Sequence, residues 1–141
     1  MPFMITASEK LSQIFETIPE IELVYQFGSS VKGRKERAKD VDVGVLLKQN
    51  TAPERQFEIY DLLSDRLSRL FRKKTDIAML NKSSPMFNYQ VLKTGHLIHG
   101  DVRRAKQFVV ATLTRYFDYL PLHQFFVAQM KKRLGVRSHG R

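Results

Sequence analysis

The amino-acid sequence predicts an α+β domain, in which helices cover one side of a small mixed β-sheet. The predicted elements follow the order helix, strand, turn, strand, helix, strand and then mostly helix, which is typical of this architecture. Only a short turn region separates the first two strands, whereas a parallel crossover needs about a dozen residues or more, usually including a helix. A doubly wound nucleotide-binding fold is therefore excluded.

Length and composition narrow the class of protein. The chain has 141 residues, of which 43% are hydrophobic, and this fits one folded domain. The absence of cysteine excludes disulfides and thiolate metal sites. No apolar run approaches the roughly 20 residues of a membrane helix, so we expect a soluble cytoplasmic protein with no membrane partner. The net charge of +10 favours nucleotides, nucleic acid or an acidic protein as partners, although a basic surface that only aids solubility fits equally well.

The N-terminal part predicts one helix and two strands. Thr6-Ala7-Ser8-Glu9 matches a capping box, and the helix that it opens stops before Pro19. Glu22 to Phe27 is a β-prone run that ends at Gly28, and Val41 to Leu47 is a second strand whose odd positions face one way. The first helix is expected to bury one apolar face, made of Leu11, Ile14, Phe15 and Ile18.

The middle of the chain predicts a long helix, a third strand and a shorter helix. A second capping box, Thr51-Ala52-Pro53-Glu54, opens the long helix, and Thr75 to Leu80 is the strand. Ser84-Pro85 starts the next helix, which Gly95 closes. The buried stripe of the long helix is predicted to be Phe57, Tyr60, Leu63, Leu67, Leu70 and Phe71.

The C-terminal part predicts a short strand followed by two helices. Leu97 to His99 is expected at a sheet edge, and Asp101 caps a helix from approximately Val102 to Tyr119. Leu120-Pro121 is expected to end that helix, and a last amphipathic stretch covers Leu122 to Leu134. We therefore expect a single domain with a core over residues 1–100 and a helical extension over residues 101–141.

Two carboxylates stand at the start of the second strand. Asp40 and Asp42 are two residues apart, so their side chains point to the same face of the strand. Like charges this close repel unless a cation neutralises them, and Mg²⁺ commonly binds one or two carboxylates together with substrate phosphates. By itself the pair also fits solvated turn residues, so it does not establish a metal site.

A glycine-serine turn follows the first strand. Gly28 allows a phosphate to approach the backbone closely, and free N–H groups with the Ser29 hydroxyl would offer donors to an anion. Lys32 lies in the same turn and is the best candidate among the loop cations for a phosphate contact. A plain turn explains a lone glycine-serine pair equally well.

Together these pieces resemble the signature of the DNA polymerase β-like nucleotidyltransferases. In that signature Gly28-Ser29 is followed, after ten residues, by Asp40-x-Asp42 at the head of an apolar strand. The segment GSSVKG is similar to the form found in small members, with Lys32 where an arginine is often found. The family carries a third carboxylate on a neighbouring strand, and Asp76 stands where it is expected.

The resemblance implies the polymerase β-like nucleotidyltransferase fold and a transfer of a nucleoside monophosphate from a triphosphate to a hydroxyl. It implies that Asp40, Asp42 and Asp76 are catalytic and bind two Mg²⁺ ions, and that ATP is the substrate. Gly28, Ser29 and Lys32 would bind the nucleotide, and Asp76 would take the proton of the acceptor hydroxyl.

The size of the chain and its C-terminal segment indicate one group within this family. The chain is similar to the minimal nucleotidyltransferases that act as antitoxins beside a helical HEPN partner, and Arg115 to Pro121 (RYFDYLP) looks like their Y-x-D-x-x-P region. In such pairs the antitoxin adds AMP units to a tyrosine of the HEPN RNase toxin. The aromatic residues near this segment predict an interface, with Phe117 and Phe125 favoured slightly as core residues instead.

Two other functions stay open on the sequence. One is an enzyme that modifies a small molecule of the aminoglycoside type. The other is a non-catalytic module that binds nucleic acid or a partner through the basic surface, which the three carboxylates disfavour.

Overall fold

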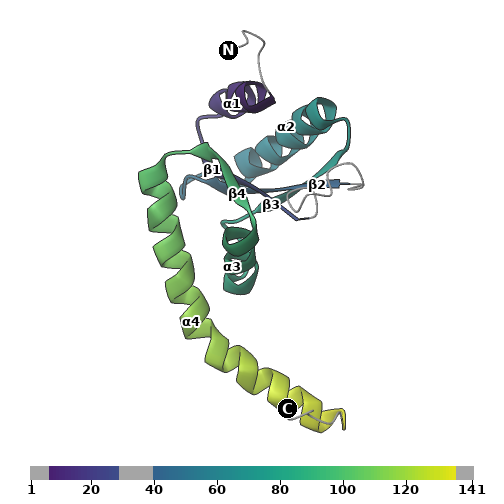
Figure 1. Cartoon of the computed structure of the whole chain (residues 1–141), viewed down its shortest axis with the longest axis vertical. Helices are drawn as coiled ribbons and strands as arrows, with labels where there is room; N and C mark the ends of the chain where they lie inside the picture. Colours follow the sequence, from purple (N-terminus) through teal and green to yellow (C-terminus); the bar gives the residue numbers. More distant parts are fainter. Residues whose placement is uncertain (1–6, 29–39, 136–141) are drawn as a thin grey trace.

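The computed structural model describes residues 7–28 and 40–135. These residues form a four-stranded sheet, in the order β3-β2-β1-β4, with four helices around it (Figure 1). The elements in chain order are α1 (Ala7–Glu16), β1 (Ile21–Phe27), β2 (Asp40–Leu47), α2 (Pro53–Phe71), β3 (Lys74–Met79), α3 (Pro85–Thr94), β4 (His96–Gly100) and α4 (Val102–Arg133).

The sheet is mixed, as predicted. Strand β1 pairs antiparallel with β2 and with the edge strand β4, while β2 and β3 are parallel. Helix α2 supplies the crossover that the parallel pair requires. The short edge strand predicted around Leu97 is therefore confirmed as β4.

Helices pack against both faces of the sheet, so the prediction of a single covered side is wrong. On one face, Val41, Val43 and Val45 of β2 pack with residues of α1 and α2. On the other face, Leu46 of β2 packs with Val91 of α3 and with residues from the start of α4. Figure 1 shows α1 and α2 above the sheet and α3 below it. The cause is the all-apolar run at the end of β2, which buries side chains on both faces.

Helix α2 begins and packs differently from the prediction. Its N-cap is Ala52, without a side-chain cap, and the Thr51 hydroxyl instead donates to the Lys48 carbonyl at 2.7 Å. The buried stripe is centred on Ile59, with Leu63 and Leu67, while Phe57 is 70% exposed. At about 100° per residue, Phe57 lies about 160° around the helix from Ile59, so both cannot face the core.

Tyr60 is the second member of the predicted stripe that is exposed. The rest of the stripe is confirmed, because Leu63 and Leu67 are fully buried and Leu70 and Phe71 pack against the same core.

The caps of α3 and α4 agree with the sequence. The Ser84 side chain accepts a hydrogen bond from the backbone N–H of Phe87 at 3.1 Å, and the Gly95 N–H donates to the Val91 carbonyl at 2.8 Å. Asp101 accepts from the backbone N–H of Arg104 at 3.1 Å. The Thr6 cap proposed for α1 lies outside the described residues.

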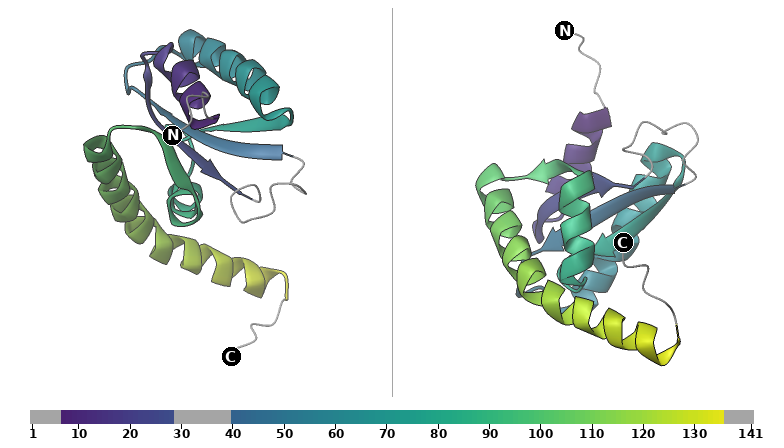
Figure 2. Two further views of the ribbon diagram at one scale, coloured as in Figure 1. Left: turned by 45° about the horizontal axis from the view of Figure 1, so that its top comes forward. Right: turned by 60° about the horizontal axis from the view of Figure 1, so that its bottom comes forward.

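Helix α4 continues through Pro121, so the predicted break there is wrong. A proline inside a helix removes one backbone hydrogen bond and bends the axis without necessarily ending the helix. Figure 1 shows α4 changing direction between its two halves, and Figure 2 shows the second half running clear of the sheet. Within the described ranges, no helix is both long enough and apolar enough to cross a membrane.

Candidate active site

Strand register brings two of the predicted carboxylates together. Asp42 of β2 is the parallel partner of Asp76 of β3, so their Cα atoms lie about 4.8 Å apart. On its other side, Asp42 is the antiparallel partner of Phe27, the last residue of β1. Asp42 therefore occupies the middle of a three-strand row at one end of the sheet.

Asp40 stands two residues earlier on the same face of β2. Its parallel partner is Lys74, and Lys74 Nζ lies 3.8 Å from Asp76 Oδ1. That ion pair is largely exposed, so it neutralises little of the negative charge. The three acidic groups thus share one face and one end of the sheet.

Gly28 lies directly against this row. Its φ of +83° is in the left-handed region that favours glycine. A Cβ atom at this position would overlap Oδ2 of Asp42. The absence of a side chain at Gly28 is therefore what leaves room for the Asp42 carboxylate beside the end of β1.

The electrostatics of Asp42 reflect this crowding. Burial raises the pKa of its carboxyl group, and the charges of Asp76 and Asp40 raise it further. The folded chain alone therefore disfavours a charged Asp42, whereas a bound cation would favour it.

The carboxylate oxygens at this end of the sheet are the type of ligand that Mg²⁺ binds. Carboxylate oxygens are its preferred protein ligands, and one or two are enough when phosphates supply the rest. Within residues 7–28 and 40–135, no three His, Cys, Asp or Glu side chains converge as a ready metal site. Asp42 and Asp76 are register partners on neighbouring strands, and Asp42 lies against Gly28.

Two of the predicted nucleotide-binding residues, Ser29 and Lys32, lie outside the described residues. Their roles therefore stay predictions. Gly28, the first residue of the same turn, is described and lies beside Asp42.

An aromatic pair beside the carboxylates was not anticipated. Phe27 and Phe87 meet edge to face with ring centroids 5.7 Å apart, and Phe27 shares a sheet face with its strand partner Asp42. The sequence signal for Phe27 was its place immediately before Gly28. No pattern in the sequence could have paired it with Phe87 on α3, because that contact depends on how α3 packs.

The family of the chain follows from a comparison with family models. Residues 9–103 match the nucleotidyltransferase domain of polymerase β, which is about two thirds of the chain. The chain belongs to the polymerase β nucleotidyltransferase family. It is thus a nucleotidyltransferase by family, as the three-carboxylate pattern predicted.

The chain is similar to a bacterial protein adenylyltransferase and to chains of solved toxin–antitoxin complexes. The protein adenylyltransferase MntA of Shewanella oneidensis is 23% identical over 124 residues, covering 88% of this chain and 86% of MntA. A solved toxin–antitoxin complex with AMP-PNP contains a chain that is 23% identical, with a TM-score of 0.73 over 87% of this chain and 97% of that one.

A second solved complex pairs a tri-AMPylated Shewanella oneidensis HEPN toxin with its MNT antitoxin. The matching chain is 22% identical, with a TM-score of 0.68, and the match covers 88% of this chain and 95% of that one. At this level of identity, the structures establish the fold of the present chain.

Proposed function

We propose that this chain transfers AMP from ATP to a hydroxyl group, specifically a tyrosine of a cognate HEPN RNase toxin, and so neutralises the toxin. The observation that carries the proposal is the placement of Asp42 between Asp76 and Gly28 at one end of the sheet. It supports a cation held by these carboxylates, and Gly28 is the first residue of the segment that we propose binds the triphosphate.

Each predicted site residue has a role in the proposal. Asp40, Asp42 and Asp76 would hold Mg²⁺, which when bound would neutralise charge on the attacking and leaving oxygens. Gly28 and Ser29 offer backbone and hydroxyl donors to the triphosphate. Lys32 adds a positive charge near the same phosphates.

The reaction balances as a single displacement. The acceptor hydroxyl oxygen forms a bond to the α-phosphorus of ATP, and the bond from that phosphorus to the bridging oxygen breaks. Pyrophosphate leaves, and the proton of the hydroxyl passes to the Asp76 carboxylate. Positioning of the reactants and neutralisation of charge supply most of the rate enhancement.

The acceptor is inferred from the relatives. MntA is named a protein adenylyltransferase, and the solved complex contains an AMPylated HEPN toxin. The polymerase β match ends at residue 103, which leaves all of α4 after Arg103 outside the matched domain. We propose that the helical extension over residues 101–141 contacts the protein acceptor.

The proposal is tested by intact mass spectrometry of a HEPN-family protein incubated with this chain, ATP and Mg²⁺. The expected result is a gain of one or more AMP residues by the HEPN protein, abolished by EDTA. Asp42→Asn should lower the transfer rate at least about a hundredfold, because it removes the charge of the central carboxylate among Asp40, Asp42 and Asp76, which we call the carboxylate row. Asp61→Asn, which changes an exposed aspartate of α2, is the matched control and should leave the rate unchanged.

Other results would redirect the assignment. AMP appearing only on an aminoglycoside would show a small-molecule enzyme. Binding of labelled RNA with no transfer to any acceptor would show a non-catalytic module. Ser29→Ala should raise the KM for ATP, and unchanged kinetics would remove Ser29 from the triphosphate site.

A further inference from the structure

The second half of helix α4 carries many apolar side chains that the rest of the described chain leaves exposed. Tyr116 still touches the body of the protein, where its ring stacks on Tyr89 of α3 with centroids 4.0 Å apart. From Leu122 to Gly135, every side chain is exposed except the half-buried His123. Packing against the rest of a protein is what usually stabilises a helix, and this segment makes few such contacts with its own domain.

The uncovered face continues the face that is buried in the first half. Ala105, Phe108 and Thr112 are the buried residues of α4. Eighteen residues, or about five turns, later stand His123, Phe126 and Met130 in the same order. Phe126 is 57% exposed and Met130 is 49% exposed, so the stripe continues after the core has ended.

The spacing of this stripe suits another helix. Tyr119, His123, Phe126 and Met130 follow one another at intervals of four, three and four residues. Side chains with this alternation form a seam that packs between the side chains of a partner helix. The rings of Tyr119 and His123, two members of this seam, stack on each other with centroids 5.5 Å apart.

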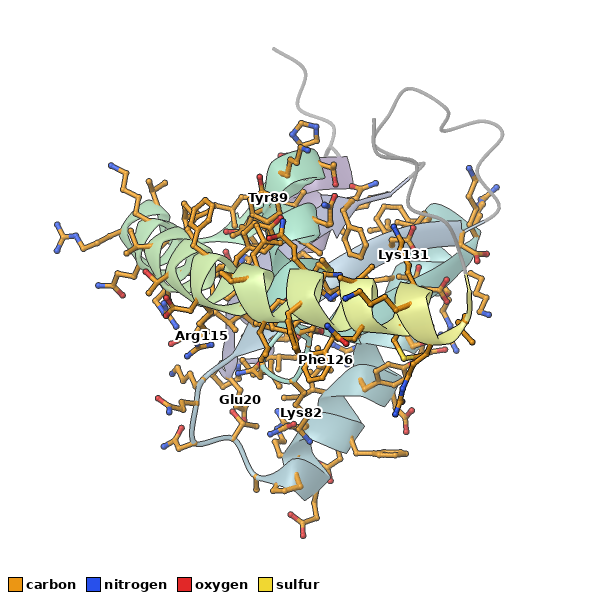
Figure 3. All side chains as sticks on the ribbon, turned by 90° about the horizontal axis from the view of Figure 1, so that it is seen from below. Glu20, Lys82, Tyr89, Arg115, Phe126 and Lys131 are labelled. Atoms are coloured by element: carbon orange, nitrogen blue, oxygen red, sulfur yellow. The ribbon has the colours of Figure 1, made fainter. Side chains whose placement is uncertain are left out.

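Charge decides what kind of partner fits. The segment from Tyr119 to Arg141 contains five Lys or Arg residues and no Asp or Glu. Lys131 and Lys132 line an apolar groove of about 600 Å³ along the same half of the helix, with Leu120 and Val127. Phe126 and Lys131 lie on different sides of α4 (Figure 3), whereas His123 belongs to both the seam and the cationic groove, so the two surfaces meet at His123.

A second copy of this chain would bring these cations together, on a protein that already carries a net charge of +10. Nucleic acid would pair with the cations and could stack a base on a phenylalanine, but it offers no apolar surface for the exposed Leu122, Val127 and Met130 side chains. An acidic protein with an apolar groove between helices satisfies both features.

We propose that residues 119–134 form a docking helix, whose Phe126–Met130 seam inserts between helices of a partner protein that carries acidic residues around an apolar groove. The identification of this partner as the HEPN protein rests on the proposed function. The acidic and apolar chemistry expected of the partner's groove does not rest on it. Docking there leaves the carboxylate row, which lies on the sheet, free for the acceptor.

The test measures binding of this chain to the HEPN-family protein without ATP, so that docking is separated from transfer. The double variant Phe126→Ala/Met130→Ala should raise the Kd at least about tenfold, because it removes the centre of the seam. Phe125→Ala is the matched control, since Phe125 is 56% exposed but lies about 100° around the helix. Its Kd should change by less than about threefold.

A second variant tests the charge argument. Lys131→Glu/Lys132→Glu should weaken binding and reduce its sensitivity to salt, whereas the unaltered chain should bind more weakly as salt rises. Thermal unfolding should be almost unchanged in all of these variants, because none of the replaced side chains is buried in the domain.

Several outcomes would overturn the inference. One is an equal loss of affinity in Phe125→Ala and in the seam variant, and another is an affinity that does not change with salt. A dimer of the chain alone that Phe126→Ala dissociates, or RNA binding that requires Phe126, would also overturn it. Failure of the unaltered chain to bind the HEPN protein would overturn both proposals. A HEPN protein that docks through Phe126 without gaining AMP would refute only the transfer, and one that gains AMP but ignores the seam would refute only the docking.

Discussion

Replacing Gly28 with alanine tests the close approach on which the site depends. The backbone φ of +83° alone costs an L-residue about 1–2 kcal/mol. The added methyl group would also overlap Asp42 Oδ2 and force the carboxylate aside, at a cost of about 1–3 kcal/mol. We expect Gly28→Ala to lower the free energy of unfolding by about 2–5 kcal/mol in total.

A double-mutant cycle separates the two parts. In an Asp42→Ala background the carboxylate is gone, and only a contact of 3.2 Å with the Asp42 Cβ remains. Gly28→Ala should then cost about 1–2 kcal/mol, which leaves a coupling energy of about 1–3 kcal/mol. Gly135→Ala is the backbone control, because Gly135 has a φ of +70° and nothing within 4 Å of its Cβ position.

The assay is urea unfolding followed by far-ultraviolet circular dichroism, since the chain has no tryptophan for fluorescence. Equal costs for Gly28→Ala in both backgrounds, no larger than that of Gly135→Ala, would refute the contact between Gly28 and Asp42. The same variant should also reduce transfer activity, because it moves a proposed cation ligand.

Three further predictions concern charge, core and strand pairing. Because the pKa of Asp42 is raised, the folded state loses stability as pH rises from the ordinary aspartate pKa through the raised one. Without metal, Asp42→Asn should therefore be at least as stable as the unaltered chain at neutral pH, with no advantage in acid. A large loss at neutral pH would contradict the unfavourable burial of the Asp42 charge and its repulsion from Asp76 and Asp40. Leu63→Ala should cost about 2–5 kcal/mol in urea unfolding, because Leu63 is fully buried between α2 and the sheet. Asn81→Ala should cost about 1–3 kcal/mol, since the Asn81 amide makes two hydrogen bonds of 2.8 Å to the backbone of Leu47, and a smaller loss would show that water replaces them.

Local patterns in the sequence determined most of the elements and part of the site. Ser84 and Asp101 cap helices because the capping residue acts within three positions of itself. Asp40 and Asp42 share a face because a strand alternates with a period of two. These relations involve neighbours in the chain, so the sequence is enough to predict them.

Only the tertiary structure decided which distant residues meet. The parallel register sets Asp42 beside Asp76, and the turn at Gly28 makes room for Asp42. The same packing buries Ile59 of α2 in place of Phe57 and covers both faces of the sheet.

Pro121 shows the limit of local rules most clearly. Its ring removes one hydrogen bond, yet α4 continues through it to Arg133. Whether a helix stops at such a residue depends on the hydrogen bonds and contacts of the residues around it. The sequence by itself determined the chemistry available at each position, whereas strand register and helix packing decided which groups meet, because these depend on the whole core at once.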